Sequence, residues 1–411
     1  MPHPPPAVAP EPPAGADSSA LRTFRAYVAL TFAFAWVPVM YTAFTVDKGF
    51  TPAQYLQLWS LYYATMVLAE VPFGWAADRW GCRRLLLAGP CVLAASFMLL
   101  DAAHSFPAAA PAMVVIGAGH AMISGADSAW LYDHLAASGR RADALHEETV
   151  AHRWRLLGVS VLDVAGGLLA FAFGTSAAFR LSVGVMLAAA LLAARLPRAP
   201  DAGPRLRPLP AWSGVSRALR QPGIAWILGW YVTVFVLLRL GFQLYQPTLL
   251  ALGARDLRLH GLLLGGLNLV AGLAALCVVR VHGRLGERAT SGLVLLLLAL
   301  SFGGLSLPFA AAMPLLCCLQ QVAFAFLQPL GRTALNRRIA GGERATLLSV
   351  QSMLARLACA VALAAGPWNA ALAESLPSTY RALAVLALLG AIFFHLTHRG
   401  RRSALETTGP G

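Results

Sequence analysis

The stretch EVPFGWAADRWGCRRLLLAG, from Glu70 to Gly89, joins two long apolar runs through a tight, charged connector. Glycine residues let such a connector turn sharply and let another helix approach closely. Arginine residues hold a connector of this kind on the cytoplasmic side of a membrane. The pattern therefore predicts two membrane-spanning helices joined by a short loop. The residues that define the connector are Gly74, Asp78, Arg79, Gly81, Arg83 and Arg84.

The composition of the 411-residue chain is that of an integral membrane protein. Hydrophobic residues make up 58% of the chain and charged residues 12%, whereas a soluble globular chain carries about 25% charged residues. The formal net charge is +14, and most of the basic excess lies in alternate short loops between the apolar runs. Because membrane topology requires this placement, we expect a lipid bilayer as the partner of the basic residues, and no nucleic acid.

The sequence carries no pattern that indicates an enzyme. Its six cysteines form neither a disulfide framework nor a CxxC metal site. His146 and His152 have the wrong spacing for a zinc-protease helix, and no phosphate-binding GxxxxGK[ST] loop is present. We therefore predict no catalytic residue, no metal, no cofactor and no direct coupling to ATP.

Apolar runs of about 20 residues recur from Tyr27 onward, and each is long enough to cross a bilayer. We expect a disordered cytoplasmic tail over 1–23 without a signal peptide, a basic linker over 196–222 and a short tail over 399–411. These segments flank two six-helix groups, 24–195 and 223–398. The expected spans are 24–44, 53–75, 84–103, 109–136, 151–173, 177–195, 223–250, 259–281, 289–309, 312–336, 345–368 and 378–397.

The arginines alternate in a way that fits an even number of spans. Clusters at Arg22/Arg25, Arg79/Arg83/Arg84, Arg140/Arg141, the linker, Arg284/Arg288, Arg337/Arg338/Arg344 and the C-terminal tail all fall on one side. The opposite side keeps Lys48, Arg180, Arg255, Arg258 and Arg381. Positive residues mark the cytoplasmic side, so both termini are expected there.

The connector has a second copy. Gly81 corresponds to Gly286, and Arg79 and Arg83 correspond to Arg284 and Arg288, each 205 residues further on. The first copy resembles the loop G-x-x-x-D-R-x-G-R-R between helices 2 and 3 of major facilitator superfamily transporters, with Cys82 at a position where the family usually has Arg. This resemblance implies an all-α membrane protein with twelve transmembrane helices, in two six-helix bundles related by a parallel repeat, with a substrate site near mid-membrane.

Further stretches resemble a bacterial branch of that superfamily classed as drug or small-molecule exporters. The resemblance implies secondary transport by a monomer in the bacterial cytoplasmic (inner) membrane. The stretches are Glu70-Val71-Pro72, SGADSAWLYD from Ser124 to Asp133, Tyr245-Gln246-Pro247, Pro329, Asn336 and RATLLS from Arg344 to Ser349.

Three carboxylates in or near the spans are candidates for proton coupling, because ionisable groups inside a bilayer are costly. They are Asp127, Asp163 and Glu70. Asp127 follows Gly125, which fits the central glycine of the antiporter motif R-x-x-Q-G-x-G in helix 4. Asp163 lies among the glycines of the helix 5 motif G-x-x-x-G-P-x-x-G-G, although its Gly-Pro pair is absent here. Each could carry a proton, or each could be structural, Asp127 paired with an arginine and Asp163 hydrogen-bonded between helices.

Helices 1, 4, 7 and 10 line the cavity in this fold, which places a set of polar and aromatic side chains there. Arg239 could bind an anionic substrate group or neutralise Asp127. Amide and aromatic side chains suit amphipathic organic molecules, although the aromatic residues could equally serve packing. The cavity candidates are Trp36, Tyr41, Arg239, Gln243, Gln246, Gln320 and Gln328.

Charged residues near the cytoplasmic helix ends are expected to form an inner gate of charge pairs that break on opening. The group comprises Glu70, Asp133, Arg153 and Arg155, with Asp78 added by the resemblance. The alternative is that each is an end charge whose head reaches the interface.

Alternating-access transport is the function that the resemblance implies. Our first expectation is proton-coupled efflux of a small amphipathic compound. Two alternatives stay open: uptake or facilitated exchange of a small organic acid bound by Arg239, and a transporter-like sensor that moves nothing.

Overall fold

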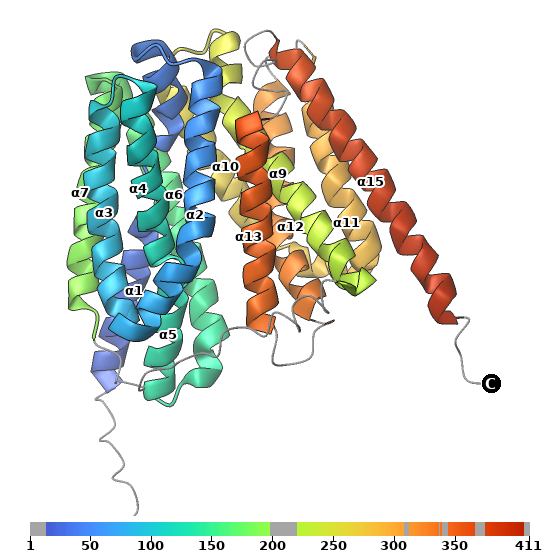
Figure 1. Ribbon diagram of the computed structural model, residues 1–411, viewed down its shortest axis with the longest axis horizontal. Coiled ribbons are helices and arrows are strands. Elements are labelled where there is room, and N and C mark those ends of the chain that lie inside the picture. Colours follow the sequence, from blue (N-terminus) through green and yellow to red (C-terminus); the bar gives the residue numbers. More distant parts are fainter. Residues whose placement is uncertain are drawn as a thin grey trace, which may run out of the picture.

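The computed structural model describes residues 14–197, 220–307, 312–336, 338, 344–365 and 375–406. Within these ranges the chain is helical and forms no strand. Two groups of helices stand side by side (Figure 1). Most of the expected linker, and the outer part of each expected tail, lie outside the described residues.

The first group holds the helices up to Arg195. Its elements are α1 (Ala14–Thr31), η1 (Val37–Val39), η2 (Thr42–Asp47), α2 (Pro52–Trp80), α3 (Cys82–Ala102), α4 (Phe106–Ile123), α5 (Ala126–Ala137), η3 (Arg141–Asp143), α6 (Ala144–Phe173) and α7 (Thr175–Arg195). Helix α1 begins at Ala14, so it includes residues that were expected in the tail.

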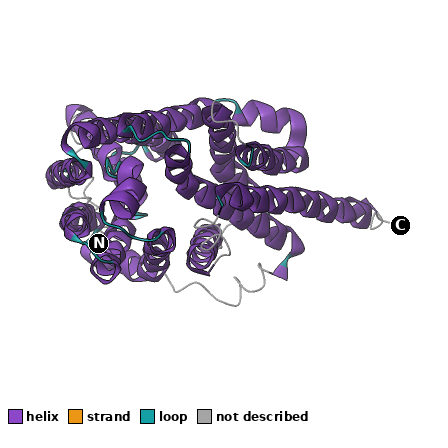
Figure 2. Cartoon of the chain, turned by 90° about the horizontal axis from the view of Figure 1, so that it is seen from above, coloured by secondary structure: helices purple, strands orange, loops and turns teal. Residues whose placement is uncertain are grey.

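The second group holds the remaining helices. They are α9 (Pro222–Ala251), α10 (Leu257–Ala275), α11 (Val278–Leu305), α12 (Met313–Asn336), α13 (Arg344–Ala365) and α15 (Leu376–Glu406). Helix α15 packs mainly on α11, and its C-terminal part leads away from the bundle in both views (Figures 1 and 2).

Ten helices in the described part of the chain are long and apolar enough to cross a membrane. Helix α2 and the broken segment from α1 to η2 complete the twelve expected spans. The first span is broken between Thr31 and η1, which contains Pro38. Proline lacks the N–H that would bond the carbonyl four residues earlier and disfavours helix in the residue before it. The fourth span breaks between α4 and α5 at Gly125, whose φ of +85° suits glycine.

The two ends of the bundle are named here by their turns. The Gly81 end contains the connector between α2 and α3, and the Gly174 end contains the turn between α6 and α7. Gly81 has φ +86°, and its repeat partner Gly286 has φ +75° at a kink inside α11. Both copies of the connector therefore turn through a left-handed glycine.

Across the two groups, α6 packs on α10 and α2 packs on α13. A Cβ atom on Gly167 would lie 2.6 Å from the Leu257 carbonyl oxygen and 2.8 Å from the Gly261 Cα, so glycine permits this close approach. Gly158 and Gly166 serve a different contact, since Cβ atoms there would meet the backbone of Ala29 and Ala35 within the first group. Of these three glycines of α6, Gly167 is thus the one that packs between the halves.

Candidate functional site

Two glutamines on α9 join the halves near the Gly174 end. The Gln246 Oε1 accepts a hydrogen bond from the Tyr41 backbone N–H at 2.9 Å, and its Nε2 donates to the Val37 carbonyl at 2.8 Å. The Val37 carbonyl also accepts from the Met40 backbone N–H, so Gln246 adds a bond from the second half to the backbone beside the break in the first span. The Tyr55 hydroxyl donates to the Gln243 Oε1 at 2.8 Å. Three of the expected cavity residues, Tyr41, Gln243 and Gln246, therefore lie in contacts between the halves.

Asp163 forms a second contact between the halves, deeper in the bundle. Its side chain is buried on α6, and its Oδ2 accepts a hydrogen bond from Asn268 Nδ2 of α10 at 2.9 Å. Sequence analysis did not single out Asn268, although it is an isolated amide in the apolar run LLLGGLNLVAGLAA. That isolation is the signal that could have identified it.

Glu70 forms a third contact between the halves. Arg356 Nη1 of α13 lies 2.6 Å from Glu70 Oε2 of α2, and both side chains are at least three-quarters buried. Two residues of the expected gate group, Glu70 and Arg155, thus pair with residues outside that group. Arg155 pairs with Asp127, while Asp133 is half-buried and Arg153 is exposed.

Asp127 is held inside the first half. Its carboxylate accepts from Arg155 Nη2 at 2.8 Å and from the Ser128 backbone N–H at 2.8 Å. The Arg155 guanidinium also lies 4.0 Å above the Phe32 ring. Of the two options for this carboxylate, the pair with an arginine of a neighbouring helix is the observed arrangement, and that arginine is not Arg239.

Arg239 lies in a partly open pocket of about 480 Å³, the part open to solvent included, formed by α9, α10 and α12. Its guanidinium carbon lies 5.2 Å from the centre of the Phe235 ring and 5.8 Å from that of the Phe324 ring. Within the described part of the chain it makes no ion pair and no hydrogen bond, and it is the one charged residue lining the pocket. The other polar lining residues are Tyr245, Asn268 and Gln321.

The remaining cavity candidates contact residues of their own halves in this structure. Trp36 stacks on Phe179 at 5.5 Å inside the first half. Gln320 is fully buried within the second half, where it accepts from the Tyr245 hydroxyl at 3.0 Å. Gln328 is exposed and donates to the Tyr231 hydroxyl at 2.7 Å.

A buried histidine, His120, lies on the first-half side of the central region and was not expected from the sequence. Its Nδ1 shares a hydrogen bond with the Tyr62 hydroxyl, and its ring lies 4.7 Å from that of Phe32. Its Nε2 has no hydrogen-bond partner among the described residues. A single histidine in an apolar run does not by itself indicate whether the residue has a functional role or only packs in the core.

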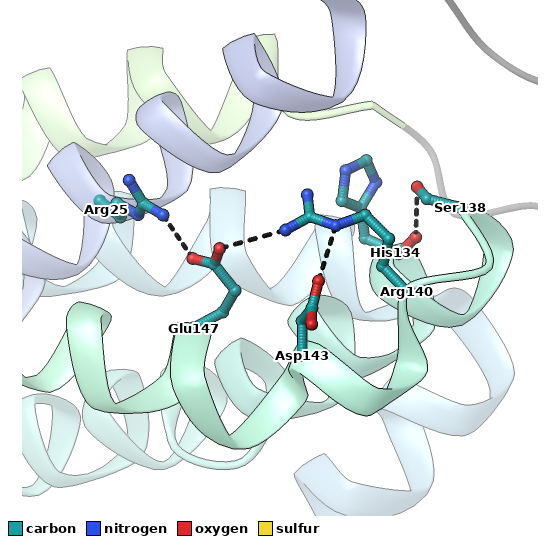
Figure 3. Close-up of polar contacts among 6 residues, drawn as sticks. All are labelled: Arg25, His134, Ser138, Arg140, Asp143 and Glu147. Atoms are coloured by element: carbon teal, nitrogen blue, oxygen red, sulfur yellow. Dashed lines mark hydrogen bonds and ion pairs between the residues drawn. The ribbon is translucent and has the colours of Figure 1, made fainter. Parts of the chain in front are cut away.

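A charge network braces the first half at the Gly81 end (Figure 3). Glu147, on α6, accepts from Arg25 of α1 at 2.5 Å, and Arg140 lies 3.5 Å from its other oxygen. Arg140 also bonds Asp143 at 2.9 Å. Because Glu147 is buried, the network fixes α1, α6 and the α5–α6 turn to one another.

The connector itself caps a neighbouring helix. Arg83 donates to the Leu196 carbonyl at 2.6 Å and to the Ala194 carbonyl at 2.5 Å, at the C-terminus of α7. A cation at this position complements the helix dipole and the free carbonyls. The other connector residues are exposed at the Gly81 end: Gly74, Asp78, Arg79, Gly81 and Arg84.

Comparison with known proteins agrees with this architecture. A family model described as Major Facilitator Superfamily matches residues 23–316, well over half of the chain. No curated protein matches it. The nucleoside transporter NupG has a similar structure, with a TM-score of 0.76 at 13% identity, covering 93% of this chain and 98% of that one.

Two other solved structures are similar over nearly their whole length. A bacterial homologue of the human lysosomal transporter Spinster has a TM-score of 0.71 at 16% identity, covering 94% of this chain and 98% of that one. A D-xylose-proton symporter has a TM-score of 0.69 at 13% identity, covering 92% and 96%. At these identities the likeness shows the fold alone.

Proposed function

This chain belongs to the Major Facilitator Superfamily of transporters, and we propose that it moves a small organic acid across a membrane by alternating access. The observation that carries the proposal is Arg239, a cation in the pocket without a hydrogen bond or ion pair to any described residue. The pocket is partly open, so water can reach this guanidinium in the free protein. A bound carboxylate would supply the missing partner.

The rest of the pocket fits the remainder of such a solute. The flanking Phe235 and Phe324 rings restrict the Arg239 guanidinium, and its planar fork matches a carboxylate in two parallel hydrogen bonds. Leucine and phenylalanine side chains supply an apolar surface, and the amides of Asn268 and Gln321 supply uncharged polar groups. This combination favours one anionic group on an apolar body.

The contacts between the halves support alternating access. Gln246 and Gln243 join the halves towards the Gly174 end, so we propose that this end is closed and that the solute reaches the pocket from the Gly81 end. Transport requires these bonds to break as the Gly174 end opens. We further propose that the Gly81 end is cytoplasmic, that the membrane is the bacterial inner membrane and that the protein acts as a monomer.

Proton-coupled efflux of a small amphipathic compound is the second candidate. It is favoured by Glu70 and Asp163, two carboxylates in contacts between the halves. A carboxylate in such a position can link its protonation to the relative placement of the halves. The two candidates differ in the need for an anionic group on the solute.

The test uses purified protein in liposomes and radiolabelled benzoate, with benzamide as a neutral molecule of the same shape. We expect benzoate to move and benzamide not to compete with it. Arg239→Gln should abolish benzoate transport, whereas Arg180→Gln, a change at an exposed arginine on α7, should leave it intact. Equal transport of benzoate and benzamide, or full activity in Arg239→Gln, would reject the organic acid and leave the amphipathic compound.

A further inference from the structure

The hydrogen bond between Asp163 and Asn268 connects the proposed solute pocket to the interface between the halves. Asp163 belongs to the first half and is buried, while Asn268 belongs to the second half and lines the pocket beside Arg239. The backbones run close together here, because a Cβ on Gly261 would lie 2.6 Å from the Asp163 carbonyl oxygen. One amide therefore touches both the solute site and a buried carboxylate.

The orientation of the Asn268 amide follows from its neighbours. Nδ2 donates to Asp163 Oδ2 at 2.9 Å and to the Leu264 carbonyl at 3.0 Å. Both of these oxygens accept hydrogen bonds when Asp163 is ionised, so the nitrogen, with its two hydrogens, must face them. This leaves Oδ1 as the amide atom that can meet a solute, and Oδ1 cannot donate to a carboxylate.

We propose that rotation of the Asn268 amide couples binding of an organic anion at Arg239 to uptake of one proton by Asp163. A protonated Asp163 becomes a hydrogen-bond donor, which Asn268 Oδ1 can accept after the amide turns by half a revolution. Nδ2 then points into the pocket and donates to the bound carboxylate. Asn268 acts in this scheme as a positioning residue between the anion and the proton.

The Leu264 carbonyl makes the rotation depend on both ligands. Turning the amide breaks the bond from Nδ2 to this carbonyl and brings Oδ1 near it. The turned amide gains a hydrogen bond from protonated Asp163 and another to the bound anion, and these two bonds together offset the lost bond to Leu264. Binding of the proton therefore favours binding of the anion, and the reverse. Such a coupling is reciprocal by thermodynamic necessity.

Other charged groups are occupied away from Asp163. His260 bonds the Ala254 carbonyl, Arg258 bonds Asp256, Tyr27 bonds the Leu86 carbonyl and Arg155 bonds Asp127. Tyr41, beyond η1, and Arg180, exposed on α7, make no hydrogen bond to Asp163 in the described part of the chain. Asn268 is therefore the polar side chain through which the state of Asp163 can be sensed.

The inference rests on the proposed function, since it needs an anion at Arg239. The scheme moves one proton with each carboxylate. An Asp163 oxygen binds the proton when the anion binds, and both are released on the other side of the membrane. Movement of the pair is electroneutral. This distinguishes the scheme from exchange of an anion alone, which would carry charge.

Calorimetric titration of the purified wild-type protein with benzoate tests the proposal. Repeating the titration in buffers of different ionisation enthalpy gives the number of protons bound together with benzoate. We expect an uptake of about one proton per benzoate at a pH at which Asp163 is ionised in the free protein, and none at a lower pH, where Asp163 already carries its proton. Asp163→Asn and Asn268→Leu should bind benzoate without proton uptake. Gln321→Leu, an amide change on α12 in the same pocket, should alter affinity but keep the uptake.

The outcomes separate the two proposals. Benzoate binding without proton uptake in the wild type, at every pH at which the protein stays folded, would overturn the coupling and leave the organic acid transporter standing. Absence of benzoate binding would overturn both. Full proton uptake in Asn268→Leu would show that the amide is not the link. Because Leu could disturb packing on α6, Asn268→Ala is measured beside it, and only variants with the thermal midpoint of the wild type are compared.

Discussion

Arg155 in the first half and Arg239 in the second half are two arginines inside membrane-length helices with different surroundings. Arg155 bonds Asp127 at 2.8 Å and lies on a phenylalanine ring. Arg239 also lies on phenylalanine rings, but it has no carboxylate partner among the described residues. The first arginine completes a structural pair, and the second leaves its hydrogen-bonding edge open. The difference shows that a buried arginine indicates a solute-binding site only when its ion-pair and hydrogen-bond partners within the protein are known.

The largest loss of stability is expected from Arg155→Leu. It leaves the carboxylate of Asp127, 7% exposed, without its cation, and breaking such a pair costs about 3 kcal/mol. The thermal midpoint of the purified protein in detergent should fall clearly. Adding Asp127→Asn to Arg155→Leu should recover much of the loss, and a wild-type midpoint in the single variant would contradict the structural role.

Gln246→Leu should cause the next largest loss of stability, at a contact between the halves. Two hydrogen bonds of about 1 kcal/mol each are lost, so the open form of the Gly174 end should become more populated. Spin labels at the exposed positions Val46 and Leu252 would report longer distances. Gln320→Leu, an amide change inside the second half, should leave those distances unchanged. Identical distances in both variants would show that Gln246 does not hold this end closed.

Removal of the pair between Glu70 and Arg356 should cost less, about 1 kcal/mol, since the Glu70 side chain is 25% exposed and that of Asp127 only 7%. A double-mutant cycle of Glu70→Gln and Arg356→Gln, read from thermal midpoints, measures the coupling between the two. The exchanged pair, Glu70→Arg with Arg356→Glu, should restore part of it. A coupling of zero would place this pair with surface ion pairs rather than with Asp127 and Arg155.

Arg239→Gln should change stability least, by less than about 0.5 kcal/mol, because no partner is left behind. Binding of benzoate should nevertheless weaken by about 10- to 100-fold, since a charge-assisted hydrogen bond contributes about 1.5–3 kcal/mol. The affinity of Arg239→Lys for benzoate should lie between those of the wild type and Arg239→Gln, because Lys keeps the charge but not the planar fork. A large drop in thermal midpoint with unchanged binding would reverse the comparison with Arg155.

The fold followed from local signals in the chain. Apolar runs of membrane length, the alternation of arginines and the two copies of the connector at Gly81 and Gly286 predicted twelve spans. The structure has these helices and a left-handed glycine at both turns. The break in the first span was not predicted, although Pro38 is a local signal for it. The contact of this broken segment with Gln246, about 200 residues further along the chain, could not be read from local signals.

The candidate site was only partly predictable. The sequence identified Asp127, Asp163, Glu70 and Arg239 because an ionisable residue in an apolar run is unusual wherever its side chain points. It did not identify Asn268, whose importance comes from contact with both Asp163 and the pocket. It also placed Trp36 and Gln320 in the cavity, whereas in the structure they pack within their own halves.

The sequence by itself determined that this protein spans a membrane, where its helices lie and which residues could carry charge inside it. Hydropathy and helix length act locally, so they can be read along the chain. Only the tertiary structure decided that Arg155 pairs with Asp127, that Arg356 pairs with Glu70 and that Arg239 lines a pocket with no ion pair to any described residue. Partner choice depends on distances of a few ångströms between helices that are far apart in the sequence, and those distances are fixed by packing.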